Sequence, residues 1–356
     1  MMTAFSATDS GFMARALRLA ERGCLTAMPN PMVGCVLVRD GIVVGEGFHV
    51  RAGEGHAEVN AIADAGEAAA GSTAYVTLEP CAVTGRTPPC TDALIQAGIA
   101  ELVFAAADPS PSAAGAGIER IRAAGITVRQ GLMATESEAL NRGFFSRVQR
   151  GRPFVTLKLA VSMDGAIAMQ SGESQWITGP AARADVQRLR AQSAAILTGI
   201  GTVLADDPSL TVRDERFDTT RQPLRVVVDS SAKMPGDARL RSGAGEVLHV
   251  TTCAGAGDLM LAGEDGRVDL GRLMQVLGDR EINSLLVECG PGLAGSLLDA
   301  RLVDELVIYQ APHIMGSETR PMVQTPGWQT LSERLQLDVV DRRQVGRDTR
   351  LTARIS

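Results

Sequence analysis

One histidine and two cysteines constrain the fold of this chain more than any other feature. His56 opens the alanine-rich, helix-patterned segment HAEVNAIADAGEAA, Cys81 ends the short strand-like run AYVTLEPC, and Cys90 precedes a second helical segment, TDALIQAG. An imidazole and two thiolates are ligands that Zn²⁺ prefers, and three protein ligands leave one tetrahedral position open, as catalytic zinc sites do. The pattern predicts that the ends of two helices and a strand hold one zinc ion per chain.

Glu58 adds a carboxylate that a structural metal site does not need. H-A-E ahead of Pro80-Cys81 and a second cysteine matches the signature of zinc-dependent deaminases. Zinc lowers the pKa of a bound water to about 7, and Glu58 is then the expected proton carrier between that water and the departing amino group. A surface histidine and small core cysteines are common singly, but their joint occurrence in a chain with four histidines favours the metal site.

The length of the chain, 356 residues, indicates two domains, because domains usually span roughly 100 to 200 residues. Helical and strand patterns alternate in both halves, which predicts an α/β fold for each. The basic, glycine- and proline-marked stretch LNRGFFSRVQRGRP lies between the halves. We therefore place the boundary there, with one domain at 1–150 and the other at 151–356.

Local patterns predict several elements. Apolar residues from Met13 to Ala20 recur at helical spacing behind Ser10, the expected N-cap, and Asp40-Gly41 predicts a hairpin turn between two strands. In the second half the runs VTLKLAVS, AILTG, LRVVVDSS, VLHVTT, SLLVECG and DELVIYQAP are expected as strands, and ARADVQRLRAQ and GSLLDARL as helices. Such strands indicate a largely buried sheet.

Composition excludes some partners. A net charge of −6 and a pI of 5.4 disfavour a nucleic-acid substrate. Asp9, Arg15 and Arg18 interrupt the apolar run that a signal peptide or a membrane span requires. The six cysteines are scattered along the chain and are expected as reduced thiols or metal ligands. The sequence thus predicts a cytoplasmic protein with neither nucleic acid nor membrane as partner.

Eight residues separate Cys81 from Cys90, a longer gap than most deaminases of nucleosides or RNA bases have. With this loop, the chain resembles the bifunctional deaminase/reductases of riboflavin biosynthesis over nearly its whole length. The resemblance is carried by the runs PNPMVGCVLV, GEGFHVRAGEGHAEVNAI, AYVTLEPC, GRTPPC, TLKLAVSMDGAIA, SGESQWITG, TGIGTVLADDPSLTVR, VVVDS, VECGPGLAGSLL and DELVIYQAP.

This resemblance implies a cytidine-deaminase-like α/β/α domain followed by a dihydrofolate-reductase-like α/β domain, in a homo-oligomer. It implies two consecutive steps on one small pyrimidine ribonucleotide. The first is hydrolytic deamination of 2,5-diamino-6-ribosylamino-4(3H)-pyrimidinone 5′-phosphate at the zinc site. The second is NADPH-dependent reduction of the ribosyl group to ribityl.

In the deaminase half the resemblance places Asn30 and His49 against the pyrimidine. From the residues alone, Asn30 is equally a turn residue of Pro-Asn-Pro and His49 a strand-end histidine. The chain departs from the family at Val83, where a loop histidine is usual. Because Val83 cannot hydrogen-bond a phosphate, that contact is expected from Arg86, Thr87 and backbone amides.

In the reductase half, Gly290 to Gly295 satisfy G-x-G-x-x-G between a strand and a helix. The acidic residue expected about twenty positions later is missing, which argues against a true Rossmann unit. The resemblance assigns these glycines to the cofactor phosphates in a different fold. It implies NADPH contacts at Ala160, Trp176, Thr202, Asp206, Ser230, Gly290, Pro291, Gly292, Leu293, Ala294, Gly295 and Ser296. By itself, Trp176 is equally a core or rim residue.

Lys158 is the residue of this half that the resemblance places at the reacting sugar, as a catalytic group. A lysine between two leucines in a strand is also typical of an exposed sheet edge. Asp164-Gly165 reads first as a tight turn. The remaining substrate contacts that the resemblance implies are Ser174, Arg190, Leu210, Arg213 and Glu288, with the arginines binding phosphate through their planar guanidinium groups.

Two other functions fit part of the pattern. A deaminase of RNA bases, or of another nucleotide, would share the zinc signature, but the acidic balance and the second domain argue against it. A catalytically silent, zinc-stiffened nucleotide-binding module would share the fold. The presence of Glu58 argues against that module.

Overall fold

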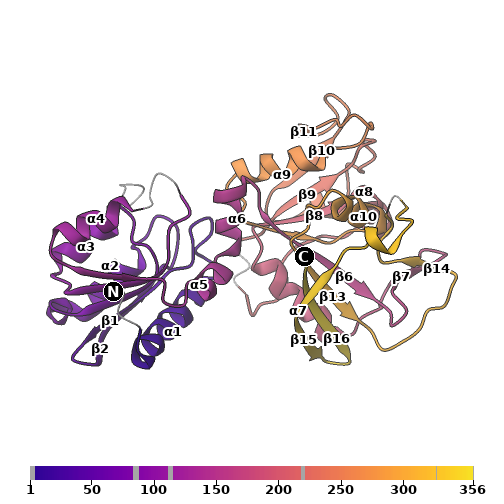
Figure 1. Cartoon of the computed structure of the whole chain (residues 1–356). Coiled ribbons are helices and arrows are strands. Elements are labelled where there is room, and N and C mark those ends of the chain that lie inside the picture. Colours follow the sequence, from indigo (N-terminus) through magenta and orange to yellow (C-terminus); the bar gives the residue numbers. More distant parts are fainter. Residues whose placement is uncertain (1–4, 83–87, 111–114, 218–220, 326, 356) are drawn as a thin grey trace. The chain divides into compact units, whose positions relative to one another are not determined.

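The computed structural model of the chain describes residues 5–82, 88–110, 115–217, 221–325 and 327–355. The chain divides into two compact units, Met1–Arg150 and Gly151–Ser356, each with its own sheet and core (Figure 1). Among the described residues, no helix is long and apolar enough to cross a membrane.

The first unit contains a five-stranded mixed sheet in the order β2-β1-β3-β4-β5. Its strands are β1 (Gly34–Arg39), β2 (Ile42–Phe48), β3 (Thr73–Leu78), β4 (Glu101–Ala106) and β5 (Thr127–Gln130). β1 runs antiparallel to β2 and β3, whereas β3, β4 and β5 are parallel. Asp40 and Gly41 turn the β1–β2 hairpin with φ of 52° and 75°, so the predicted turn is confirmed.

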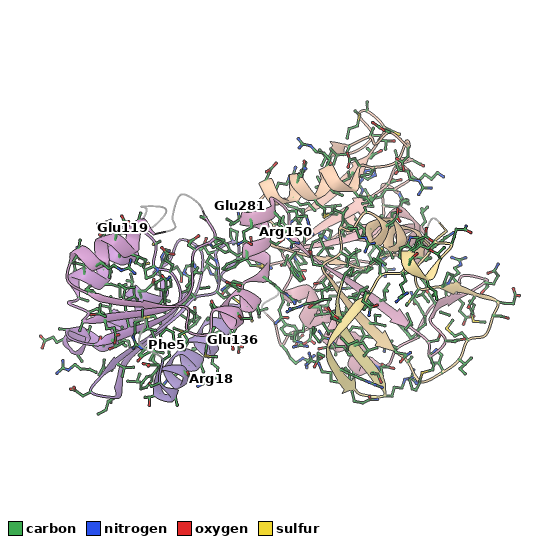
Figure 2. The ribbon with its side chains drawn as sticks, viewed as in Figure 1. Phe5, Arg18, Glu119, Glu136, Arg150 and Glu281 are labelled. Carbon is green, nitrogen blue, oxygen red and sulfur yellow. The ribbon has the colours of Figure 1, made fainter. Side chains whose placement is uncertain are left out.

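Helices cover both faces of this sheet and make the unit an α/β/α sandwich. They are α1 (Ala7–Glu21), α2 (Ala57–Ala65), the 3₁₀ turn η1 (Gly66–Ala69), α3 (Cys90–Gln96), α4 (Ala116–Ala123), α5 (Ala134–Leu140) and α6 (Arg142–Arg150). α2, α3 and α4 enclose one apolar cluster with the sheet, and α1 encloses another on the opposite face. Charged side chains such as Arg18, Glu119 and Glu136 lie on the exposed sides of these helices (Figure 2).

The first helix begins earlier than the sequence predicted. Its N-cap is Ser6 rather than Ser10, because Ser6 and Asp9 form a capping box in which each side chain accepts from the other residue's backbone N–H, at 3.0 and 2.8 Å. The basic stretch before the domain boundary also holds more structure than expected, because most of it folds into α6.

Two glycines let the helices approach the sheet closely. A Cβ atom on Gly34 of β1 would lie 2.0 Å from the carbonyl oxygen of Ala16 in α1. A Cβ atom on Gly47 of β2 would lie 2.3 Å from the carbonyl oxygen of Ala57, the first residue of α2. Any other residue at either position would displace a helix, and α2 is the helix that follows His56.

The second unit contains a nine-stranded sheet in the order β11-β10-β9-β8-β12-β6-β13-β16-β15. Its strands are β6 (Phe154–Val161), β8 (Ala195–Gly199), β9 (Leu224–Val228), β10 (Val247–Thr251), β11 (Leu259–Met260), β12 (Ser284–Val287), β13 (Glu305–Gln310), β15 (Leu337–Val345) and β16 (Asp348–Ile355). β16 and β15 are antiparallel additions to an otherwise parallel sheet. β7 (Ala166–Met169) and β14 (Thr319–Pro321) form a separate ribbon.

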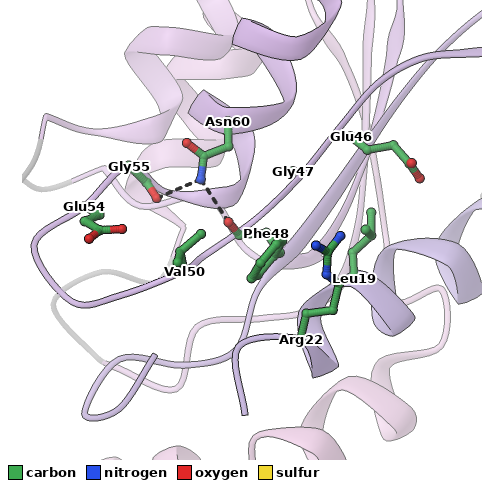
Figure 3. A pocket seen from close by; sticks show the side chains of 9 residues that line it. All are labelled: Leu19, Arg22, Glu46, Gly47, Phe48, Val50, Glu54, Gly55 and Asn60. Carbon is green, nitrogen blue, oxygen red and sulfur yellow. Dashed lines mark hydrogen bonds between the residues drawn. The ribbon is translucent and has the colours of Figure 1, made fainter. Parts of the chain in front are cut away.

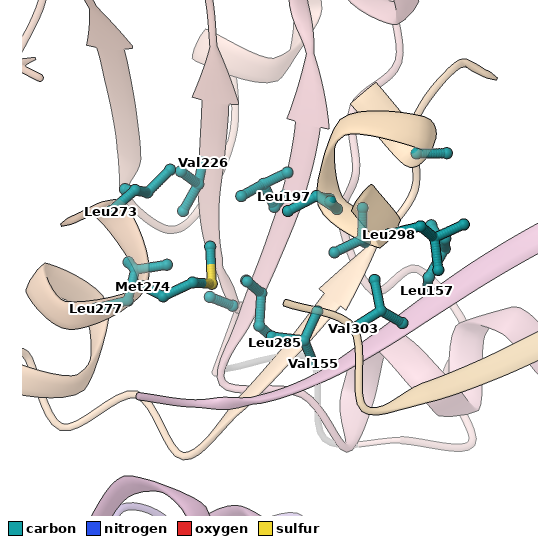
Figure 4. Packing of buried hydrophobic residues seen from close by; sticks show 14 of the residues in the cluster. Val155, Leu157, Leu197, Val226, Leu273, Met274, Leu277, Leu285, Leu298 and Val303 are labelled. Carbon is teal, nitrogen blue, oxygen red and sulfur yellow. The ribbon is translucent and has the colours of Figure 1, made fainter. Parts of the chain in front are cut away.

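The helices of this unit lie on both faces of its sheet. They are α7 (Pro180–Ala191), α8 (Ile200–Asp206), α9 (Leu270–Asp279) and α10 (Pro291–Asp299), with 3₁₀ turns η2 (Arg239–Arg241) and η3 (Leu331–Glu333). On one face the sheet residues Leu157, Leu197 and Leu285 pack with Leu273 of α9 and Leu298 of α10 (Figure 4). The predicted α/β class is therefore confirmed in both halves, although the sequence did not predict α8, α9 or the β15–β16 hairpin.

Strand β6 alternates strictly between the two faces. Leu157 and Leu159 are buried in the main core, so Lys158 and Ala160 point to the opposite face. β6 lies between β12 and β13 inside the sheet. The alternative of an exposed sheet edge for Lys158 is therefore wrong.

Candidate active sites

The zinc-ligand candidates converge at one end of the first sheet. The ligand atoms of His56, Cys81 and Cys90 all lie within 4.8 Å of one another, and His56 Nδ1 is 2.8 Å from Cys90 Sγ. His56 is the N-cap of α2 and Cys90 is the first residue of α3, while Cys81 follows β3. One imidazole and two thiols at this spacing fit a tetrahedral zinc ion with an open position.

Hydrogen bonding within this cluster prepares a thiolate. Cys81 Sγ lies 3.4 Å from Cys90 Sγ. Hydrogen bonding with Cys90 and His56 outweighs burial and lowers the pKa of Cys81 well below its usual value. The backbone N–H of Cys90 also donates to Cys81 Sγ at 3.3 Å. The anionic sulfur is thus held by the N-terminus of α3, as a metal ligand requires.

Glu58 lies on the first turn of α2 beside these ligands. Its side chain is 3% exposed, and it shares a hydrogen bond with Cys90. Burial raises the pKa of Glu58 above its usual value. The site therefore pairs three metal-ligand atoms with one buried carboxyl group that is close to them without belonging to the ligand set.

Asn30 and His49 contact each other near the same helix. Asn30 Nδ2 lies 3.0 Å from His49 Nε2, and the His49 ring meets the His56 ring edge-on at 5.3 Å between centroids. His49 is 3% exposed, its other nitrogen lies 3.3 Å from the carbonyl oxygen of Gly55, and burial lowers its pKa. Both ring nitrogens of His49 thus have protein partners, while the Asn30 carbonyl is available to a ligand.

A pocket opens beside this segment, between the end of α1 and the end of β2 (Figure 3). Arg22 lies 4.5 Å above the ring of Phe48, and Asn60 donates to the carbonyl oxygens of Phe48 and Gly55, at 2.9 and 3.1 Å. The pocket is lined by none of the zinc-ligand candidates. Its contribution to the site is the Asn60 contact that fixes Gly55, the residue before His56.

Three charged residues meet on the α7 face of the second sheet. Arg190 of α7 donates to both carboxylate oxygens of Glu288, at 2.6 and 3.1 Å, and Lys158 Nζ lies 3.6 Å from the same carboxylate. Burial alone would raise the pKa of Glu288, but Arg190 and Lys158 outweigh it and lower that pKa to about 2. Glu288 is therefore a buried anion held by two cations.

The two glycine loops come together at the ends of neighbouring strands. Gly199 is the N-cap of α8 after β8, and Gly290 is the N-cap of α10 after β12. A Cβ on Gly199 would lie 3.1 Å from Leu293, and one on Gly290 would lie 3.9 Å from Thr202. No side chain of the described residues caps the N-terminus of α10. Its first backbone N–H groups can therefore donate to a cofactor phosphate.

Within the same run, Gly295 has a packing role. A Cβ at this position would lie 1.8 Å from the carbonyl oxygen of Gln324. Pro291, Gly292 and Ser296 are partly or fully exposed, whereas Ala294 and Gly295 are buried. The first turn of α10 is therefore the part of the run that can meet a ligand.

Other predicted contacts are spread over the same end of the sheet. Ser174 Oγ lies 3.5 Å from Asp206 Oδ1, so a predicted substrate contact and a predicted cofactor contact are neighbours. Trp176 is 66% exposed, which excludes a core role. Ser230 accepts from the N–H of Val268 at 3.0 Å, which leaves its hydroxyl hydrogen for a ligand.

Two predicted substrate contacts are less simply placed. The Leu210 side chain is 3% exposed and packs on Ile196 and Leu286, so only its backbone is available to a ligand. Arg213 is exposed, and its backbone N–H donates to Gln187. Val83, Arg86 and Thr87 lie outside the described residues.

Arg183 is a neighbour of Trp176 that the sequence did not single out. Its guanidinium lies 4.5 Å from the indole centroid and donates to the carbonyl oxygen of Thr178 at 2.7 Å. An arginine in the first turn of the helix that follows the tryptophan was the available signal.

The comparisons with known proteins cover both units. Residues 6–106 match the cytidine and deoxycytidylate deaminase zinc-binding region, and residues 153–351 match the RibD C-terminal domain. The riboflavin biosynthesis protein RibD of Escherichia coli strain K12 is 50% identical over 96% of this chain and 97% of its own length. The chain belongs to the RibD family.

Other members of the RibD family support this assignment. The Haemophilus influenzae protein is 46% identical over 99% of this chain and 98% of its own length. The solved structure of Acinetobacter baumannii RibD, form 1, is 41% identical with a TM-score of 0.92, covering 98% of this chain and 99% of that one. As a RibD protein, the chain is a bifunctional deaminase and reductase of riboflavin biosynthesis that uses zinc and NADPH.

Proposed function

We propose that residues 1–150 form the deaminase domain and residues 151–356 the reductase domain, and that both act on one pyrimidine ribonucleotide. The deaminase removes a ring amino group from 2,5-diamino-6-ribosylamino-4(3H)-pyrimidinone 5′-phosphate, and the reductase converts its ribosyl group to ribityl. A Thermotoga maritima protein described as such a deaminase and reductase is 33% identical over 98% of this chain and 99% of its own, with a TM-score of 0.87.

The observation that carries the deaminase proposal is the buried carboxyl group of Glu58 beside three metal-ligand atoms. His56, Cys81 and Cys90 would hold the zinc, which would supply a hydroxide nucleophile at neutral pH. Glu58 accepts a proton from the attacking water and delivers it to the amino group as the C–N bond breaks and ammonia leaves. Its raised pKa suits a group that both accepts and donates a proton.

Substrate binding in this domain is assigned to Asn30, His49, Arg86 and Thr87. The Asn30 carboxamide can match a donor and an acceptor on a ring edge. His49 supports that carboxamide through their 3.0 Å contact. Arg86 and Thr87 are assigned to the phosphate on sequence alone.

In the reductase domain, bound NADPH would supply the hydride for C1′ of the ribosyl group, whose ring C–O bond opens in the reduction. The leaving ring oxygen then needs a proton. Arg190 does not give up a proton, whereas the ammonium of Lys158 can. Glu288, 3.6 Å from Lys158 Nζ and bonded to Arg190, holds both cations towards the substrate, with Ser174, Leu210 and Arg213 as further contacts.

The cofactor is assigned to the adjoining loops. The N-terminus of α10 at Gly290 to Ser296 binds its phosphates, next to Thr202 and Asp206. Ala160 lies on the same face of β6 as Lys158, which supports a nicotinamide contact on the face of the sheet that carries Lys158. Trp176 and Ser230 complete the contacts with NADPH.

A reciprocal pair of variants tests both assignments. Glu58→Gln keeps the zinc ligands but removes the proton carrier, so we expect ammonia release to fall about 10²- to 10⁴-fold while reduction of the deaminated intermediate is unchanged. Lys158→Ala should do the reverse, measured as NADPH oxidation. Wild-type deamination by Glu58→Gln would remove Glu58 from its role. Loss of both activities in either variant would contradict the separation of the two sites.

Three narrower points stay predictions. A cytoplasmic location is supported by the six cysteines, all of them described residues and none of them in a disulfide. A homo-oligomer is supported by β15, an edge strand that exposes Val339 and Val340. The absence of a nucleic-acid partner rests on the net charge of −6.

A further inference from the structure

Asn141 makes a two-point contact with the backbone of Met32, a residue 109 positions earlier in the chain. Its Oδ1 accepts from the Met32 N–H at 2.7 Å, and its Nδ2 donates to the Met32 carbonyl at 2.9 Å. Asn141 is the C-cap of α5 and is 3% exposed. A carboxamide in this position replaces the pair of hydrogen bonds that a neighbouring strand would supply.

Met32 belongs to the loop between α1 and β1, which has no regular strand or helix of its own. The same loop carries Asn30, whose backbone N–H donates to Ala27 at 3.0 Å and whose side chain meets His49. The Asn141 contact is therefore two residues from the predicted pyrimidine contact. Because the Asn141 side chain binds both the N–H and the carbonyl of Met32, it fixes the position and the orientation of the backbone at that residue.

We propose that Asn141 is a positioning residue of the deaminase site, which holds the loop so that the Asn30 carboxamide faces the pyrimidine edge. The inference rests on the proposed role of Asn30 as a substrate contact. Asn141 itself touches no ligand and acts through Asn30. Small displacements of a positioning group are costly, and about 1 Å can reduce activity 10²-fold.

Ser137 provides a matched control on the same helix. Its hydroxyl donates to the carbonyl oxygen of Thr77 in β3, so it contacts the sheet and not the loop of Asn30. Ser137 and Asn141 are both buried in α5 or at its cap. Ser137→Ala therefore loosens α5 without releasing Met32, and separates a loss of helix packing from a loss of positioning.

The test measures kcat and KM for ammonia release from the pyrimidine nucleotide, using the full-length zinc enzyme. We expect Asn141→Ala to reduce kcat/KM about tenfold or more, mainly through KM, while zinc content and NADPH oxidation with the deaminated intermediate stay unchanged. Asn141→Asp keeps the acceptor for the Met32 N–H and should lose less. Ser137→Ala should lower the melting temperature and leave KM unchanged.

A double-mutant cycle with Asn30→Ala distinguishes the possible failures. If Asn141 acts through Asn30, the double variant is no worse than Asn30→Ala alone. Additive losses, or an equal rise in KM for Ser137→Ala, would overturn the positioning role. An Asn30→Ala variant with wild-type KM would instead overturn the proposed substrate contact and the inference with it. Impairment of Asn30→Ala with a normal Asn141→Ala would overturn the inference alone.

Discussion

At the scale of a single residue, Glu288 sets the charge of the proposed reductase site. Its side chain is 11% exposed, yet it is an anion, because Arg190 donates hydrogen bonds to both carboxylate oxygens and Lys158 lies nearby. The pKa of about 2 keeps it charged throughout the range in which an enzyme works. Its negative charge in turn keeps two cations together on one face of the sheet, where we propose that the phosphorylated sugar binds.

Glu288→Gln should therefore destabilise the second unit in a pH-dependent way. Because the folded pKa lies below its value of 4.5 in the unfolded chain, the stabilisation is full above about pH 4.5 and is lost as pH falls towards 2. We expect a loss on the order of 3 kcal/mol at pH 7 that shrinks below pH 4. Both tryptophans, Trp176 and Trp328, belong to this unit, so urea unfolding followed by their fluorescence measures it. A loss that does not vary with pH would contradict the assignment.

At the scale of an element, α1 is fixed by its first turn. Asp9 closes the capping box with Ser6 and also accepts from the hydroxyl of Tyr75 at 2.5 Å and from Arg129 at 3.2 Å. Although burial opposes ionisation, Arg129 and Tyr75 hold the pKa of Asp9 well below its usual range. The helix start is thereby tied to β3 and β5.

Ser6→Ala should cost the first unit about 1 kcal/mol, because it removes the N-cap. Ser10→Ala, at the N-cap that the sequence suggested, should change stability by less than about 0.5 kcal/mol. The free energy of unfolding of both variants is measured by urea unfolding followed by far-ultraviolet circular dichroism. Tryptophan fluorescence identifies the part of the signal that comes from the second unit. The reverse order of the two variants would mean that the helix starts at Ser10.

Elements with a strong local pattern were predictable, and elements without one were not. The Asp40-Gly41 hairpin and the strands of the second sheet core follow from turn chemistry and apolar runs. β15 was not predictable, because its residues are exposed on both faces and LDVVDRRQV therefore shows no alternation of apolar and polar side chains. α1 was found, but Ser10 was preferred as cap because Asp9 was not recognised as the partner of Ser6.

The candidate sites divide in the same way. The zinc set was predictable because its residue types are rare and closely spaced. Arg190 and Glu288 contact each other although they lie 98 positions apart in the chain. The family resemblance assigned each of them to the substrate, but no sequence signal predicted their contact. Asn141 and Arg183 had no sequence signal strong enough to single them out, since neither belongs to a catalytic pattern.

At the scale of the whole molecule, the two units have separate hydrophobic cores. The cluster around Leu157, Leu197 and Leu285 belongs to the second unit, and those around Val76 and Val36 belong to the first. The metal-ligand cluster found among the described residues lies in the first unit. Each unit therefore has its own basis for stability.

Zinc removal should accordingly stop one activity alone. After treatment with a strong chelator, we expect no ammonia release from the pyrimidine nucleotide. NADPH oxidation with the deaminated intermediate should stay within about twofold of the untreated rate, since His56, Cys81 and Cys90 lie outside the reductase unit. Added Zn²⁺ should restore deamination. A parallel fall in both rates would show that the metal supports the fold of the whole chain.

The close approach of α1 and α2 to the first sheet has a consequence for how this family can vary. Gly34 and Gly47 each face a helix carbonyl oxygen that leaves no room for a methyl group. In a saturation library selected for deaminase activity, both positions would tolerate almost no replacement and would look as intolerant as Glu58. Intolerance to mutation in this domain therefore identifies positions of close helix–sheet packing as readily as it identifies residues that take part in the reaction.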